Sequence, residues 1–104
     1  MTDRELLELS AKAAGIELRW HPDGTAYSDS RCKDYWGVWN PIADDGDALR
    51  LAVNLDIVPR VINGVAFAWR DGVCDIQEPH NDDPYAATRR AIVRAAAEIG
   101  RSMK

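Results

Sequence analysis

Large and small side chains alternate along residues 64–69, and an Asp71-Gly72 pair follows directly. Alternate residues of an extended strand point to opposite sides. The large side chains on one side are those of Val65, Phe67 and Trp69. The small residues on the other side are Gly64, Ala66 and Ala68. The pattern predicts a strand over residues 60–70 with an aromatic face and a second face on which a helix can pack closely.

An Asp-Gly pair between two such segments is typical of a two-residue hairpin turn. It predicts a partner strand over residues 73–78, with Trp69 opposite Cys74 and Phe67 opposite Ile76. In that register Cys74 and Ile76 share the aromatic face.

Three segments have the apolar spacing of amphipathic helices. They run from Thr2 to a stop at Gly15, from the acidic residues 44–47 to Leu55, and from Pro84 to about Ser102. Each begins at a side chain that can accept hydrogen bonds from free backbone N–H groups: Thr2 of a capping box with Glu5, the aspartates of residues 44–47, and Asp83.

Further strands are expected at residues 16–20, followed by a turn at 21–24, and at residues 34–40, with a loop around 28–33 between them. The order is helix, two or three strands, helix, two strands, helix (α-β-β(-β)-α-β-β-α). This order is typical of an α+β domain with a mainly antiparallel sheet. Because the predicted sheet has an aromatic face and a small-residue face, we expect helices on both, in a three-layer α/β/α sandwich forming a single domain over residues 1–104.

The composition fits one globular domain: 104 residues, 46% hydrophobic, with a formal net charge of −4. The apolar runs are far shorter than a membrane span, and the N-terminus lacks the features of a signal peptide. A cytoplasmic location is therefore expected, with Cys32 and Cys74 as reduced thiols.

Arginines gather on the last predicted helix. Residues 89–104 hold five cations against the single carboxylate of Glu98, and Arg90, Arg94 and Arg101 fall on one side. Arginines at this spacing can bind phosphates or carboxylates, but a solvated helix flank is the commoner explanation. The acidic balance of the whole chain is unlike that of a duplex-binding domain.

Three aromatic residues gather at Tyr35, Trp36 and Trp39. In a strand they point to both sides, so they are either sheet core beneath helices or, in part, an exposed contact patch. Both interpretations stay open here.

The sequence offers little for catalysis or metal binding. The aspartates at 44, 45, 47 and 56 lack the spacing of a calcium loop, and helix capping already accounts for the first three. His21 and His80 have no partner at ligand spacing, and the glycines form no phosphate loop. We expect no catalytic residue, no metal and no cofactor.

Two runs resemble the phage ABA sandwich domain, a family of small bacteriophage and prophage proteins. They are residues 39–53, WNPIADDGDALRLAV, and residues 87–100, ATRRAIVRAAAEIG. The resemblance implies a layered architecture and a place in the host-cell cytoplasm. It implies no enzymatic activity, cofactor or catalytic residue.

These observations predict a non-enzymatic phage accessory protein that binds a host protein, or a second copy of itself. Its expected apolar anchors are Tyr35, Trp36 and Trp39, with Arg90 and Arg94 as the polar rim. One alternative is binding of nucleic acid or a nucleotide ligand through the arginine face of the last helix. Another is a small hydrolase that gathers His21, His80 and aspartates in a cleft.

Overall fold

A computed structural model describes residues 1–28, 37–79 and 83–103. The fold is α+β, as expected, with three helices and two three-stranded antiparallel sheets among these residues. The helices are α1 (Asp3–Ala14), α2 (Asp45–Asn54) and α3 (Pro84–Ser102). The first sheet holds β1 (Leu18–Trp20), β2 (Ala26–Ser28) and β3 (Gly37–Val38), and the second holds β4 (Val58–Ile62), β5 (Val65–Arg70) and β6 (Cys74–Pro79).

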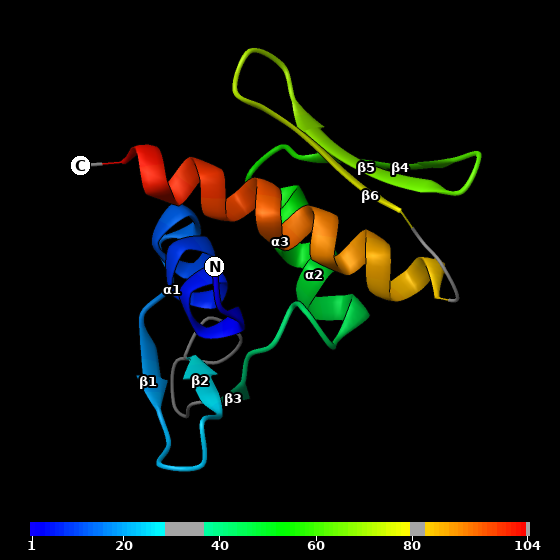
Figure 1. Cartoon of the computed structure of the whole chain (residues 1–104). Coiled ribbons are helices and arrows are strands. Elements are labelled where there is room, and N and C mark those ends of the chain that lie inside the picture. Colours follow the sequence, from blue (N-terminus) through cyan, green and yellow to red (C-terminus); the bar gives the residue numbers. More distant parts are fainter. Residues whose placement is uncertain (29–36, 80–82, 104) are drawn as a thin grey trace.

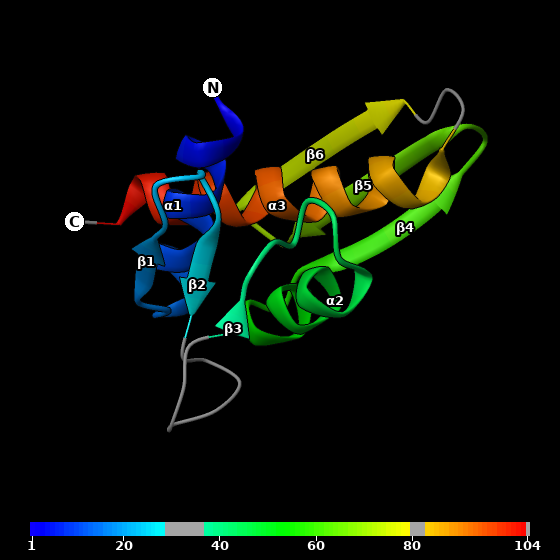
Figure 2. The same ribbon diagram turned by 90° about the horizontal axis from the view of Figure 1, so that it is seen from below.

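Helix α3 lies at the centre of the molecule. The sheet β4–β6 runs along one side of it, and α1 and α2 lie on the other side (Figures 1 and 2). The small sheet β1–β3 is attached beyond α1, where the Arg4 guanidinium stacks 4.3 Å from the ring centroid of Trp20. All three helices therefore lie on one side of β4–β6. The expected α/β/α sandwich, with helices on both faces of one sheet, is not confirmed.

The centre of α3 is buried around most of its circumference because its side chains are small. Ala91, Ala95, Ala96 and Val93 are fully buried, and the sheet meets α3 through the equally buried Ala66 and Ala68. Small side chains on both surfaces let a helix and a sheet approach closely. The predicted apolar stripe along one face of this helix therefore underestimated how much of α3 is core.

Helices α1 and α3 also cross in close contact. At Gly100 an added Cβ would lie 2.0 Å from the carbonyl oxygen of Leu9, so only glycine fits. The buried hydroxyl of Ser10 donates to the backbone carbonyl of Val93 at 3.0 Å. A buried hydroxyl needs such a partner, and the bond fixes the relative position of the two helices.

The predicted helix starts are confirmed. Thr2 accepts from the N–H of Glu5, Asp44 accepts from the N–H of Asp47, and Asp83 accepts from the first N–H groups of α3. These bonds satisfy donors that a helix cannot satisfy internally.

The prediction of one strand over residues 60–70 was wrong. The chain turns at Asn63 and Gly64, whose φ values are 50° and 80°, so that β4 and β5 form a hairpin. Two successive residues with positive φ are typical of the tight turn that Asn-Gly favours. Residues 58–79 therefore form three strands where two were expected.

The predicted register between the last two strands was also wrong. The loop has three residues, 71–73, so that Trp69 lies opposite Asp75 and Phe67 opposite Gln77. Cys74 and Ile76 therefore turn toward α3, where both pack against the core. The two-residue loop would have placed Asp75 and Gln77 beneath α3 instead, and burying a carboxylate there is unfavourable.

The turn expected at residues 21–24 is confirmed, and it joins the antiparallel strands β1 and β2. Of the strand expected over residues 34–40, the described part is paired at Gly37 and Val38. None of the helices within the described ranges is both long and apolar enough to cross a membrane.

Candidate functional site

Trp39, one of the three predicted aromatic anchors, belongs to the core. Its side chain is 4% exposed, so it offers no surface to a partner. Of the two interpretations left open for this residue, the core is the one observed, although Trp39 follows β3 and is not itself part of a strand. Tyr35 and Trp36 lie outside the described residues, and their role as anchors stays a prediction.

The arginines of α3 are paired with carboxylates. Arg89 meets Asp45 at 2.7 Å and also donates to the carbonyl of Ile42. Arg90 lies 3.4 Å from Asp3 and 3.8 Å from Glu78, and Arg94 pairs with Glu78 as well. These contacts tie α3 to α1, α2 and β6. They also neutralise most of the positive charge that binding of a polyanion at this surface would require.

The predicted rim residues Arg90 and Arg94 are thus half-buried and engaged within the fold. Arg101, nearer the end of α3, pairs with Glu98 at 3.6 Å. An anion would have to displace a bound carboxylate at each of these positions.

The aspartates before α2 are also engaged by the fold. Besides the cap of Asp44, Asp45 pairs with Arg89, and the buried Asp47 accepts from Asn40 N–H and pairs with Arg50 at 2.7 Å. The predicted capping role is confirmed for Asp44 only. No group of three or more histidine, cysteine or acidic side chains in the described part of the chain is arranged to hold a metal ion.

His21 lies exposed in the β1–β2 turn. Its Nδ1 is 3.1 Å from Asp23, whose pKa is lowered mainly because its carboxylate accepts from Thr25. Burial raises the pKa of the half-buried Cys74 thiol, which disfavours its reactive thiolate form. Cys32 and His80 lie outside the described residues, so the hydrolase hypothesis stays untested.

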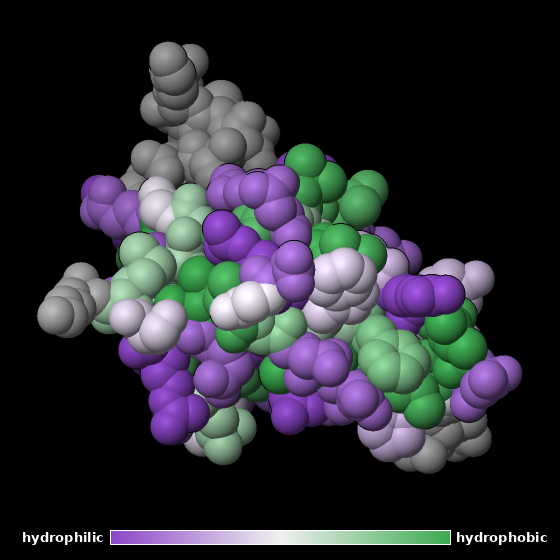
Figure 3. All heavy atoms as spheres, turned by 90° about the horizontal axis from the view of Figure 1, so that it is seen from above, coloured by the Kyte–Doolittle hydropathy of each residue, from purple (hydrophilic) through white to green (hydrophobic). Residues whose placement is uncertain are grey.

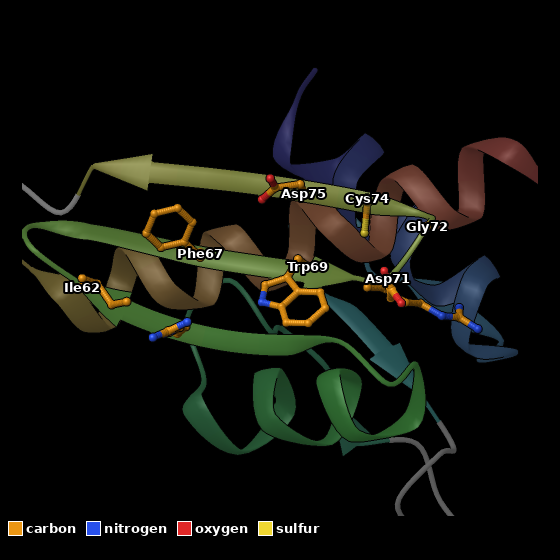
Figure 4. Close-up of a pocket in the computed structure, with 9 residues that line it drawn as sticks. Ile62, Phe67, Trp69, Asp71, Gly72, Cys74 and Asp75 are labelled. Carbon is orange, nitrogen blue, oxygen red and sulfur yellow. The ribbon is translucent and has the colours of Figure 1, made fainter.

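A surface with two aromatic side chains, Phe67 and Trp69, lies on the side of β4–β6 that faces away from α3. We call this surface the outer face. By strand register it consists of Val58, Arg60, Ile62, Val65, Phe67, Trp69, Asp75, Gln77 and Pro79. Phe67 and Trp69 lie on the same side of the central strand, Phe67 toward β6 and Trp69 toward β4, with α3 behind the sheet (Figure 4). Trp69 is 37% exposed although it lies on the central strand of the sheet.

A hollow of about 400 Å³ opens at this face beside Trp69. Its lining combines the two aromatic rings with four charged residues: Arg60, Arg70, Asp71 and Asp75. None of these four forms a salt bridge within residues 1–28, 37–79 and 83–103, in contrast to the arginines of α3. Seen from above, hydrophobic and intermediate residues over the sheet are bordered by hydrophilic ones (Figure 3).

The edges of this sheet are less suited to binding than its face. Strand β4 contains Pro59 and β6 ends at Pro79, and proline has no N–H with which to pair an added strand. Proline on an edge strand opposes strand-to-strand association. A partner of this sheet is therefore expected on the outer face.

The sequence contained evidence for this surface, but the expected strands placed its charged residues on the other side of the sheet. Once Asn63-Gly64 is taken as a turn, Arg60 falls opposite Phe67, and the three-residue loop brings Asp75 opposite Trp69. Charged residues on the aromatic side of a sheet indicate that this side is not covered by the chain's own helices.

Comparison with protein-family models, with curated proteins and with solved structures finds no match to this chain.

Proposed function

We propose that this protein acts by binding another protein through the outer face, without catalysis. The observation that carries the proposal is the position of Phe67 and Trp69 on a sheet face that α1, α2 and α3 leave uncovered. Large rings that are already ordered by a sheet lose little entropy on binding, and such residues dominate interface energies.

The chemistry of the outer face favours a protein partner over a nucleic acid. Two arginines and two aspartates line the hollow, so its formal charge balances, and the chain as a whole is acidic. Nucleic acids are bound mainly through uncompensated positive charge. A protein surface with an apolar centre and charges of both signs at its border matches the outer face better.

The alternative, a nucleic acid or nucleotide ligand on the arginine face of α3, has weaker support. Each arginine of that face has a carboxylate partner in the fold. Binding there would require breaking those pairs.

The resemblance to phage ABA sandwich proteins supports a host protein as the partner and the host cytoplasm as the place. It also gives the outer face a structural meaning. A partner packed on this face would supply the third layer that an α/β/α arrangement has and that the chain's own helices do not provide.

The experiment compares capture of bacterial host proteins by three immobilised proteins: the wild type, Trp69→Ala and the control Val53→Ala. Val53 is 70% exposed on α2, away from the outer face. A host protein retained by the wild type and Val53→Ala should be lost with Trp69→Ala. With the captured protein purified, Trp69→Ala should weaken binding about thirtyfold, the equivalent of about 2 kcal/mol for an aromatic anchor.

Equal binding of that protein by all three would contradict the proposal. Binding that depends on Arg90 and Arg94 and falls steeply with salt would favour the nucleic-acid alternative instead. Melting curves for each variant establish that a loss of binding is not a loss of folding.

A further inference from the structure

We propose that in concentrated free protein the outer face is covered by the same face of a second copy, so that self-association and host-partner binding exclude each other. This inference rests on the proposed function, because it assigns an occupant to the same surface. Two features of the outer face carry it, its charge pattern and its rings, and the size of the face sets how strong the pair can be.

The charges of the outer face are placed so that it complements itself. Arg60 lies on the edge strand β4 and Asp75 on the opposite edge strand β6, with the rings of Phe67 and Trp69 between them. A two-fold axis parallel to β5, midway between two stacked sheets, places β4 of one copy over β6 of the other. Arg60 then lies two residue pairs, about 7 Å along the strand, from the partner's Asp75, a distance that the long arginine side chain can span, twice in the same interface.

A two-fold axis across the strands gives the opposite result. It stacks β4 over the second copy's β4, where like charges at position 60 approach each other, and like charges across an interface are unfavourable. The charge pattern therefore selects one symmetric arrangement. A symmetric interface must be self-complementary, and the outer face meets this requirement in the first arrangement only.

The rings occupy the middle of this arrangement. With the axis parallel to β5, the two central strands face each other, so Phe67 and Trp69 of both copies meet at the interface centre. Stacked sheets pack about 10 Å apart, a distance that side chains of this size fill. The aromatic side chains would then lose most of their remaining contact with water, as a hot spot requires.

The size of the face sets the strength of the pair. Three strands of up to six residues cover a footprint of roughly 14 Å by 20 Å. Stable complexes bury about 800 Å² on each partner, which is more than this footprint provides. The pair is therefore weak, with a dissociation constant in the micromolar range or above, and gives way to a host protein that binds more tightly.

Sedimentation equilibrium of the purified full chain, from about 10 µM to about 500 µM, tests the inference. The average mass of the wild type should rise from 11.6 kDa toward twice that value. Trp69→Ala should remain at the mass of one chain over the same range. The control Val53→Ala should associate as the wild type does.

Charge exchange tests the arrangement itself. Arg60→Asp and Asp75→Arg should each weaken association about tenfold or more, because each puts like charges together twice. The double variant Arg60→Asp/Asp75→Arg restores opposite charges across the axis and should return association close to the wild-type value. Restoration is a result that mere loss of folding cannot produce.

A wild type that stays at the mass of one chain throughout would overturn the inference and leave the proposed function standing, because the face would then be free for a host protein. Association that persists in Trp69→Ala, or a double variant no better than the single ones, would also overturn it. The proposed function fails separately, if host-protein capture is unaffected by Trp69→Ala.

Discussion

Replacing Gly100 by alanine tests the central packing of the molecule. Glycine at this position lets α3 touch the backbone of α1: a Cβ would lie 2.0 Å from the Leu9 carbonyl oxygen and 2.8 Å from its carbonyl carbon. Comfortable contacts between such atoms are more than 1 Å longer than the first of these distances. Backbone cannot move aside as a side chain can, so the two helices must separate.

The cost follows from two opposing effects. Overpacking of a well-packed site costs typically about 1–3 kcal/mol, and this contact belongs at the upper end or beyond. Alanine favours a helix over glycine by about 1 kcal/mol. Gly100→Ala should therefore lower the free energy of unfolding by about 2 kcal/mol. For a domain of this length, the melting temperature should fall by roughly 10 °C.

Urea and thermal unfolding followed by circular dichroism measure this change, with Gly46→Ala as the matched control. A Cβ at Gly46, in the first turn of α2, meets the Arg50 guanidinium at 3.2 Å, the end of a flexible and half-exposed side chain. That variant should keep its stability within about 1 kcal/mol of the wild type. A melting temperature of Gly100→Ala equal to or above that of the wild type would refute the close crossing of α1 and α3.

Three further predictions concern the turn, a buried hydroxyl and a thiol. Gly64→Ala should destabilise the protein by about 1 kcal/mol because of its φ of 80°, whereas Asn63→Gly should be nearly neutral; equal melting temperatures for the two variants would contradict the turn. Ser10→Ala should lower the free energy of unfolding by about 1 kcal/mol, because the hydrogen bond to Val93 is lost. Ser102→Ala, at the exposed end of α3, should lower it less. The reverse order in urea unfolding would contradict the buried bond. In a Cys32→Ser background, Cys74 should react with iodoacetamide more slowly than free cysteine at pH 8, because burial raises the pKa of its thiol; in urea the difference should vanish, and a folded-state rate equal to that of free cysteine would contradict it.

The local rules of sequence were sufficient for the helices. Thr2, Asp44 and Asp83 each cap the helix that they were expected to cap. Capping depends on a few neighbouring residues, so it can be predicted without the rest of the fold.

The second sheet required information that is not local. The Asp-Gly pair favours a two-residue loop, but the observed three-residue loop puts Ile76 beneath α3 and Asp75 in water. Tertiary burial decided between two loops that differ little in local energy. The Asn63-Gly64 turn, by contrast, was a local signal that the expected strand over residues 60–70 passed over.

The candidate site was the hardest feature to predict, because it depends on which surfaces the chain covers with its own helices. The aromatic residues 35, 36 and 39 were predicted as anchors because they lie close together in the sequence, yet Trp39 lies in the core. The sequence pattern predicted that a helix covers Phe67 and Trp69. In the structure they lie on the side of β4–β6 that α1, α2 and α3 leave uncovered. In the sequence the arginines of α3 form a basic surface. In the structure Asp3, Asp45 and Glu78 lie beside these arginines and pair with them.

The openness of the outer face can be measured directly from the tryptophan indole N–H signals in NMR spectra recorded with a soluble paramagnetic agent. In dilute protein the agent should strongly broaden the Trp69 signal and leave the signal of Trp39, which is 4% exposed, unchanged. At high concentration Trp69 should become protected as copies associate. A Trp69 indole as protected as that of Trp39 in dilute protein would contradict the account, because the chain itself would then cover the proposed docking surface.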